Sequence, residues 1–181
     1  MVKRFFGFLN RVLWHGFYHR MGTMNRNFFF TVLLLSAVQL SAQRVVSFDE
    51  LSVRLKTESD TLYLVNFWAT WCAPCVAELP YFEALHEKYR DRPFKVLLVS
   101  LDYKSQVAKR VSPFIQANHI QSEVVVLSEK DPNRWLPKVS EEWTGAIPAT
   151  LVFDKSRRVF LEQSFESLRD LELVLQPFLA P

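Results

Sequence analysis

The apolar and polar positions of residues 43–181 fall into segments with the periods of helices and strands. Phe48, Leu51 and Leu55 recur at helical spacing. The apolar positions between Val76 and Tyr89 repeat in the same way. Helices are predicted over residues 44–56, 74–90, 105–119 and 168–179. Strands are predicted over residues 61–68, 94–101, 123–127, 149–153 and 158–162, with an irregular polar and aromatic loop at 131–145.

The order of these segments predicts an α/β fold. Strand, helix, strand, helix and strand follow one another, which is typical of parallel crossover connections. A hairpin and a closing helix come next, and the hairpin adds antiparallel edge strands. We therefore expect residues 43–181 to form one domain, a sandwich in which a central mixed β-sheet is flanked by helices.

Residues 1–42 are predicted to be an N-terminal extension and signal peptide. A basic start at residues 24–27, an apolar run at 28–38 and small residues before Gln43 follow the plan of a secretory signal. Cleavage is expected after Ala42. The run is shorter than the roughly 18 apolar residues of a membrane span, and an uncleaved anchor is the alternative. Both versions imply export, which in a bacterium with a cell envelope means the periplasm.

Residues 1–23 allow two interpretations, a basic membrane-surface segment or a stretch that precedes the true start at Met24 or Met21. The chain has 22 Lys and Arg against 19 Asp and Glu, a net charge of +3. Five of the basic residues and none of the acids lie in residues 1–42, so the remainder carries a net charge of −2. Such a domain lacks the electrostatic footprint of a nucleic-acid-binding protein.

The chain has two cysteines, Cys72 and Cys75, and their position predicts redox chemistry. Cys72 follows a predicted strand and begins a predicted helix, where unpaired N–H groups and the helix dipole favour a thiolate. Cys75 lies one helical turn later and can attack the sulfur of Cys72 within a mixed disulfide. Pro74 fits the first turn because its missing N–H costs little there.

Two other interpretations of the cysteine pair remain. Half of a zinc site would need two more ligands, and the domain offers His86 and His119, both in predicted helices without ligand spacing. A purely structural disulfide is the second. We expect no metal and no cofactor.

The same residues carry a family resemblance. Residues 65–75, with the sequence VNFWATWCAPC, resemble the active-site strand and helix start of thioredoxin-like proteins. The pattern Cys-x-Pro-Cys-x-x-Glu-x-Pro at residues 72–80 resembles the TlpA/ResA branch of exported thiol-disulfide oxidoreductases. Residues 145–150, GAIPAT, are similar to that family's cis-proline loop. The resemblance covers roughly residues 43–181 and implies a thioredoxin-like three-layer sandwich.

The resemblance also implies roles for individual residues. Cys72 would be the attacking thiol and Cys75 the resolving thiol, forming a redox-active disulfide. Glu78 would handle protons or tune the thiol pKa values, because Asn66 stands where thioredoxins carry an aspartate. The implied substrate-binding positions are Trp71, Ala73, Pro74, Ile147 and Pro148, with a cis peptide bond between the last two.

Simpler structural interpretations of the same residues remain possible alternatives to these roles. Glu78 can be a solvated residue that favours the helix dipole, and Pro148 an ordinary trans turn residue. Trp68 is expected in the core and Trp71 at the surface. Trp135 and Trp143 either line a substrate groove or anchor their loop, and anchoring is preferred.

The function predicted from these observations is an exported reductase of protein disulfides. By analogy with the family, its partners can include apocytochromes c awaiting haem attachment and a membrane electron donor that keeps it reduced. The alternatives are a disulfide oxidase or isomerase of secreted proteins, and a non-enzymatic peptide-binding module.

Overall fold

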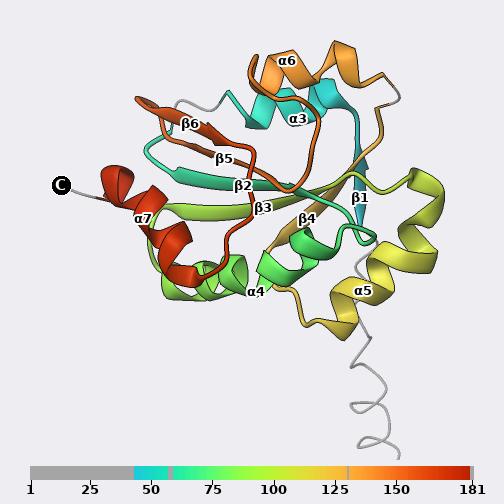
Figure 1. Cartoon of the computed structure of the whole chain (residues 1–181), viewed down its shortest axis with the longest axis horizontal. Helices are drawn as coiled ribbons and strands as arrows, with labels where there is room; N and C mark the ends of the chain where they lie inside the picture. The colour runs from blue at the N-terminus through green and yellow to red at the C-terminus, as the bar shows by residue number, and fades with distance from the viewer. Residues whose placement is uncertain (1–42, 57–58, 130, 180–181) are drawn as a thin grey trace, which may run out of the picture. The chain divides into compact units, whose positions relative to one another are not determined.

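A six-stranded mixed sheet forms the centre of the molecule, with the strand order β1-β4-β3-β2-β5-β6 (Figure 1). The four strands β1, β4, β3 and β2 are mutually parallel, whereas β5 runs antiparallel to β2 and β6 antiparallel to β5. The strands span Arg44–Val46 (β1), Leu62–Trp68 (β2), Phe94–Ser100 (β3), Glu123–Leu127 (β4), Ala149–Phe153 (β5) and Arg158–Leu161 (β6).

This computed structural model describes residues 43–56, 59–129 and 131–179. The predicted signal peptide, its cleavage after Ala42 and the segment 1–23 lie outside the described residues, and the boundary at residue 43 stays a prediction. No helix within the described ranges is long and apolar enough to cross a membrane.

Helices cover both faces of the sheet and give it three layers. The α-helices span Phe48–Arg54 (α3), Ala73–Lys88 (α4), Ser112–Ala117 (α5), Leu136–Val139 (α6) and Leu168–Leu179 (α7). Helices α4, α5 and α7 pack against one face, and α3 and α6 against the other (Figure 1). The predicted sandwich with a mixed sheet is confirmed.

Strand β2 lies at the centre of this packing. Its side chains alternate between the two apolar cores, with Leu64 and Trp68 beneath α4 and Val65 and Phe67 on the opposite face. Because both faces are covered, every residue from Leu64 to Trp68 is buried, as expected for a central strand. Trp68 is fully buried, as predicted.

The helix predicted over residues 44–56 is wrong in its first turn. Residues 44–46 form β1, which pairs with β4 at the sheet edge. Three residues are too few to show a strand period, and their pairing partner lies about 80 positions away in sequence. Ser47 then caps α3, and a reciprocal capping box with Glu50 fixes the start of the helix.

The helix predicted over residues 105–119 is helical from Lys104 to Ala117, but it is not a single α-helix. The segment forms a 3-10 turn over Lys104–Gln106, a π-helical turn over Val107–Val111 and then α5. Pro113 lies in the first turn of α5, where its missing N–H leaves the carbonyl of Lys109 without an α-helical donor. Ser112 instead donates to the carbonyl of Val107, five residues back.

Two loops also contain defined local structure. The predicted loop at 131–145 contains a 3-10 turn, Pro132–Arg134, and the short helix α6. The hairpin turn at residues 154–157 lacks glycine, and the Asp154 side chain closes it. Its Oδ1 accepts the N–H groups of Ser156 and Arg157, each at 2.7 Å, so an Asx turn replaces the glycine turn.

The buried centre of β2 gives the first testable prediction. Leu64→Ala removes a fully buried side chain from the sheet and should lower the free energy of unfolding by about 2–5 kcal/mol. Val53→Ala, at a position 74% exposed on α3, should change it by less than about 0.5 kcal/mol. Urea unfolding of the two variants tests the assignment of β2 to the centre, which equal stabilities would contradict.

Candidate active site

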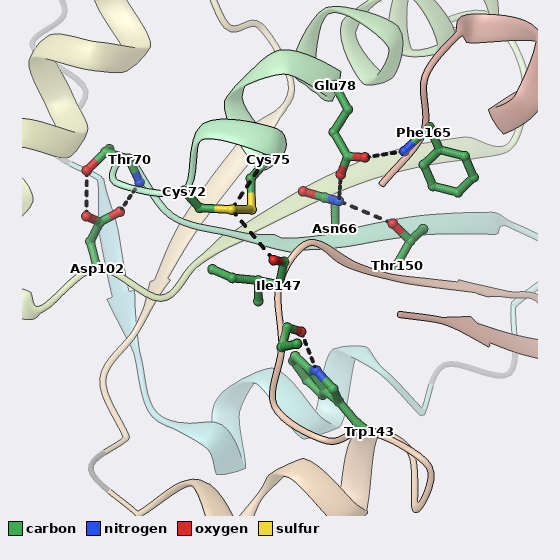
Figure 2. The surroundings of a disulfide bond; sticks show 11 residues. Asn66, Thr70, Cys72, Cys75, Glu78, Asp102, Trp143, Ile147, Thr150 and Phe165 are labelled. Atoms are coloured by element: carbon green, nitrogen blue, oxygen red, sulfur yellow. Dashed lines mark hydrogen bonds between the residues drawn. A yellow bond between two sulfur atoms is a disulfide. The ribbon is translucent and has the colours of Figure 1, made fainter. Parts of the chain in front are cut away.

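Three segments meet at the end of the sheet where β2 and β3 finish and β5 begins. Cys72 follows β2, Asp102 follows the parallel neighbour β3, and Pro148 precedes β5. Because β5 runs antiparallel to β2, its beginning lies beside the end of β2, where Phe67 pairs with Ala149. Figure 2 shows the disulfide between the start of α4 and the loop before β5. The carboxyl ends of parallel strands are a common place for binding and catalytic sites.

The two cysteines are joined in a disulfide at the start of α4. Their Cα atoms lie 5.3 Å apart. Cys72 is the N-cap residue, and its Sγ accepts the backbone N–H of Cys75 at 3.3 Å. The same N–H faces a thiolate when the pair is reduced, and such a contact together with the helix dipole favours the ionised form of Cys72.

The exposure of the two cysteine residues is unequal. Cys72 is 6% exposed, whereas Cys75 is completely buried. Trp71 beside them is 60% exposed, and Ala73 and Pro74 are exposed as well, so the predicted surface position of Trp71 is confirmed. Cys72 is therefore the more accessible of the two cysteines.

The Ile147–Pro148 peptide bond faces the disulfide and is cis, as predicted. The carbonyl oxygen of Ile147 lies 3.8 Å from Cys72 Sγ (Figure 2). No described residue accepts the N–H of Ile147. Pro148 is buried and Ile147 is partly exposed. The Ile147 backbone thus points its carbonyl toward Cys72, and its N–H has no acceptor among the described residues.

Two tryptophans anchor the loop before this proline. Trp135 and Trp143 are 5% and 6% exposed and pack edge to face at 5.2 Å. The indole Nε1–H of Trp143 donates to the carbonyl of Ala146 at 2.8 Å. The anchoring interpretation is therefore confirmed for both residues.

Glu78 is buried beneath α4, one turn after Cys75, so its interpretation as a solvated residue is wrong. Its Oε1 accepts the Asn66 side-chain amide at 2.8 Å, and its Oε2 accepts the backbone N–H of Phe165 at 2.8 Å (Figure 2). Burial raises the pKa of Glu78 from 4.5 to about 7, against the opposing effect of these two hydrogen bonds.

Asn66 connects Glu78 to the sheet. Its Nδ2 also donates to Thr150 Oγ1 at 3.2 Å, which links β2 to β5. Its Oδ1 is buried and accepts no hydrogen bond from the described part of the chain. Asn66 Oδ1 therefore lies beside Glu78, an acid whose pKa is near neutral, and has no donor among the described residues. It is suited to accept a hydrogen bond from a protonated group.

Sequence reasoning missed several residues that support the site. Asp102 is buried and accepts hydrogen bonds from Thr70 N and Thr70 Oγ1, at 2.9 and 2.6 Å, and from Ser100 Oγ. It thereby holds the turn that leads into Cys72. A polar residue directly after a buried parallel strand is the sequence signal that could have indicated it. Glu162, after β6, accepts hydrogen bonds from the proline loop, and no local pattern indicates this.

The described residues contain no group of three or more His, Cys, Asp or Glu side chains that could hold a metal ion. His86 lies on α4 and His119 beyond the end of α5, away from the disulfide-bonded cysteines in sequence. The expectation of no metal and no cofactor stays a prediction.

Comparison with known proteins agrees with this geometry. The family model described as AhpC/TSA family matches residues 37–160. A thiol-disulfide oxidoreductase ResA from Oceanobacillus iheyensis is 41% identical over 54 residues, 30% of this chain and 28% of that protein. ResA from Bacillus cereus is 24% identical over 115 residues, 64% of this chain and 61% of that protein. The chain thus spans less than two thirds of these relatives.

Solved structures agree on the fold. A putative thiol:disulfide interchange protein DsbE from Chlorobium tepidum has a TM-score of 0.54 at 24% identity, over 70% of this chain and 85% of that one. At this identity the likeness shows a shared thioredoxin-like fold. Because the family model covers more than half of the chain and the named relatives are ResA proteins, this protein belongs to the AhpC/TSA family and is a ResA/TlpA-like member of it.

Proposed function

We propose that this protein is an exported thiol–disulfide oxidoreductase that reduces disulfide bonds in other proteins. The observation that carries the proposal is the Cys72–Cys75 pair at the start of α4, where Cys72 is 6% exposed and Cys75 is completely buried. The sulfur of Cys72 faces the backbone of Ile147, whose carbonyl oxygen lies 3.8 Å away. The names of the ResA relatives agree with this chemistry.

The reaction begins with both cysteines reduced. The Cys72 thiolate attacks one sulfur of the substrate disulfide, which forms a mixed disulfide and releases the other substrate sulfur as a thiolate that takes up a proton. The Cys75 thiol loses its proton and attacks Cys72 Sγ. This closes the Cys72–Cys75 disulfide and releases the second substrate thiol. Two electrons pass to the substrate, and a dithiol donor must return the pair to its reduced form.

The substrate segment is expected to lie in an extended conformation across Trp71, Ala73, Pro74 and Ile147. All four are exposed or partly exposed beside Cys72. The free N–H and the carbonyl of Ile147 can pair with the backbone of such a segment, as in the addition of a strand to a sheet edge. Polypeptide disulfides are therefore the proposed substrates.

Glu78 is proposed to accept the proton of Cys75. The two residues are one turn apart on the buried face of α4, and side chains at this spacing are neighbours. A carboxyl group whose pKa is about 7 can both take and return a proton near neutral pH. Asn66 holds the carboxylate in place through its side-chain amide.

The location and the partners are further parts of the proposal. The export signal predicted at residues 24–42 supports an extracytoplasmic location, the periplasm in a bacterium with a cell envelope. An oxidising compartment would leave the pair oxidised, so a membrane electron donor is proposed as its reductant. Apocytochromes c are proposed among the substrates by analogy with the family.

Substitution of the cysteines tests the proposed function. Cys72→Ser should reduce insulin no faster than the uncatalysed background, because the nucleophile is absent. Cys75→Ser keeps the nucleophile and lacks the resolving thiol, so it should accumulate mixed disulfides with exported proteins, detected on non-reducing gels. Wild-type insulin turnover in Cys72→Ser would contradict the proposal.

Glu78→Gln tests the proton transfer. The single-turnover rate of the wild type should rise with pH through about 7, because only ionised Glu78 accepts the proton of Cys75. The Gln variant should lose this inflection. Glu87→Gln, on the exposed side of the same helix, is the matched control and should keep it. An unchanged pH profile in Glu78→Gln would exclude Glu78 as the base.

The same residue predicts how stability depends on pH. Between pH 4.5 and about 7 the folded protein keeps the proton of Glu78 and the unfolded chain releases it. The contribution of Glu78 to stability is therefore complete below pH 4.5 and decreases as the pH rises to 7, by up to about 3 kcal/mol. The stability difference between wild type and Glu78→Gln, measured by urea unfolding across this range, should show that decrease, and a constant difference would contradict the raised pKa.

A further inference from the structure

The proline loop is held by a carboxylate that lies outside the cysteine motif. Glu162 directly follows β6, whose last residue, Leu161, pairs with Thr150 on β5. The antiparallel register therefore places Glu162 opposite Ala149, the residue after Pro148. The end of the edge strand β6 thus lies beside the segment that leads into the cis peptide bond.

Glu162 accepts three hydrogen bonds from two residues of that loop. Its Oε2 accepts Thr144 N at 3.0 Å, and its Oε1 accepts Ala146 N at 2.8 Å together with the hydroxyl of Thr144. Gly145 lies between these residues with a φ of +97°. This conformation is readily open to glycine and lets two nearby amides face one anion.

Glu162 and Trp143 together fix both backbone groups of Ala146. The N–H of Ala146 donates to Glu162, and its carbonyl accepts the indole N–H of Trp143 at 2.8 Å. Ala146 immediately precedes Ile147, whose carbonyl lies 3.8 Å from Cys72 Sγ. A shift of Ala146 therefore moves the backbone on which a polypeptide substrate is expected to pair.

We propose that Glu162 is a positioning residue that makes the site selective for polypeptide disulfides over small ones. The inference rests on the proposed function and deepens it by naming the substrate class that depends on the loop. A small disulfide needs only Cys72, whereas a polypeptide also needs the Ile147 backbone at a fixed distance from that sulfur. Loss of the Glu162 contacts should therefore weaken polypeptide binding and leave the thiol chemistry unchanged.

Glu162→Gln tests this selectivity. The glutamine amide has one acceptor oxygen, and its NH₂ group would face one of the loop N–H donors. We expect KM for insulin to rise about tenfold, the loss associated with one hydrogen bond to a charged group, with little change in kcat. The second-order rate with oxidised glutathione should stay within about twofold of the wild type. Glu166→Gln, at an exposed position four residues later, is the matched control.

Trp143→Phe removes the second contact to Ala146 and keeps an aromatic ring in the core. It should raise KM for insulin in the same selective way, and it provides the test if Glu162→Gln does not fold. An equal loss of rate with insulin and glutathione would overturn the inference, because the contacts would then act on the cysteines. Unchanged KM for insulin in a folded variant would overturn it as well. Wild-type insulin reduction, measured in parallel, tests the proposed function separately.

Discussion

The short connection between the buried strand β2 and helix α4 is the constraint on which the site depends. Only four residues separate Trp68, at the end of the strand, from Ala73, at the start of the helix. Trp68 is fixed in the core and Asp102 holds Thr70 in the turn. Cys72 therefore has to be the N-cap of α4, where the Cys75 N–H and the helix dipole act on its sulfur.

The same strand-to-helix connection places the two cysteines in different environments and so gives them different roles. Cys72 lies where the chain leaves the core and Cys75 one turn inside it, so Cys72 keeps a small exposure of 6% and Cys75 has none. The buried side of that turn also holds Glu78, which is attached to β2 through Asn66 and to the segment before α7 through Phe165 N. A carboxyl group in this position is costly to ionise, and that cost is what brings its pKa to about 7, a value useful for proton transfer.

Local patterns predicted the parts of the structure that depend on local physics. The central strands, α4 and α7 and the position of the cysteine pair followed from hydrophobic period or from a short motif, whereas the cis bond before Pro148 followed from the family resemblance. The structure differed from the sequence-based predictions where contacts distant in sequence or backbone chemistry decide the local conformation. β1 is a strand because β4 lies beside it, and the segment before Pro113 forms 3-10 and π-helical turns in place of a continuous α-helix. The supports of the site, Asp102 and Glu162, come from strand ends far away in sequence.

The reduction potential of the Cys72–Cys75 pair tests the proposed direction of the reaction most directly. It can be measured on the folded protein by equilibration with glutathione or dithiothreitol buffers and quantification of the free thiols. A reductase requires a value near that of thioredoxin, about −270 mV. A value near about −120 mV, typical of a strong disulfide oxidant, would contradict the account and identify the protein as an oxidase.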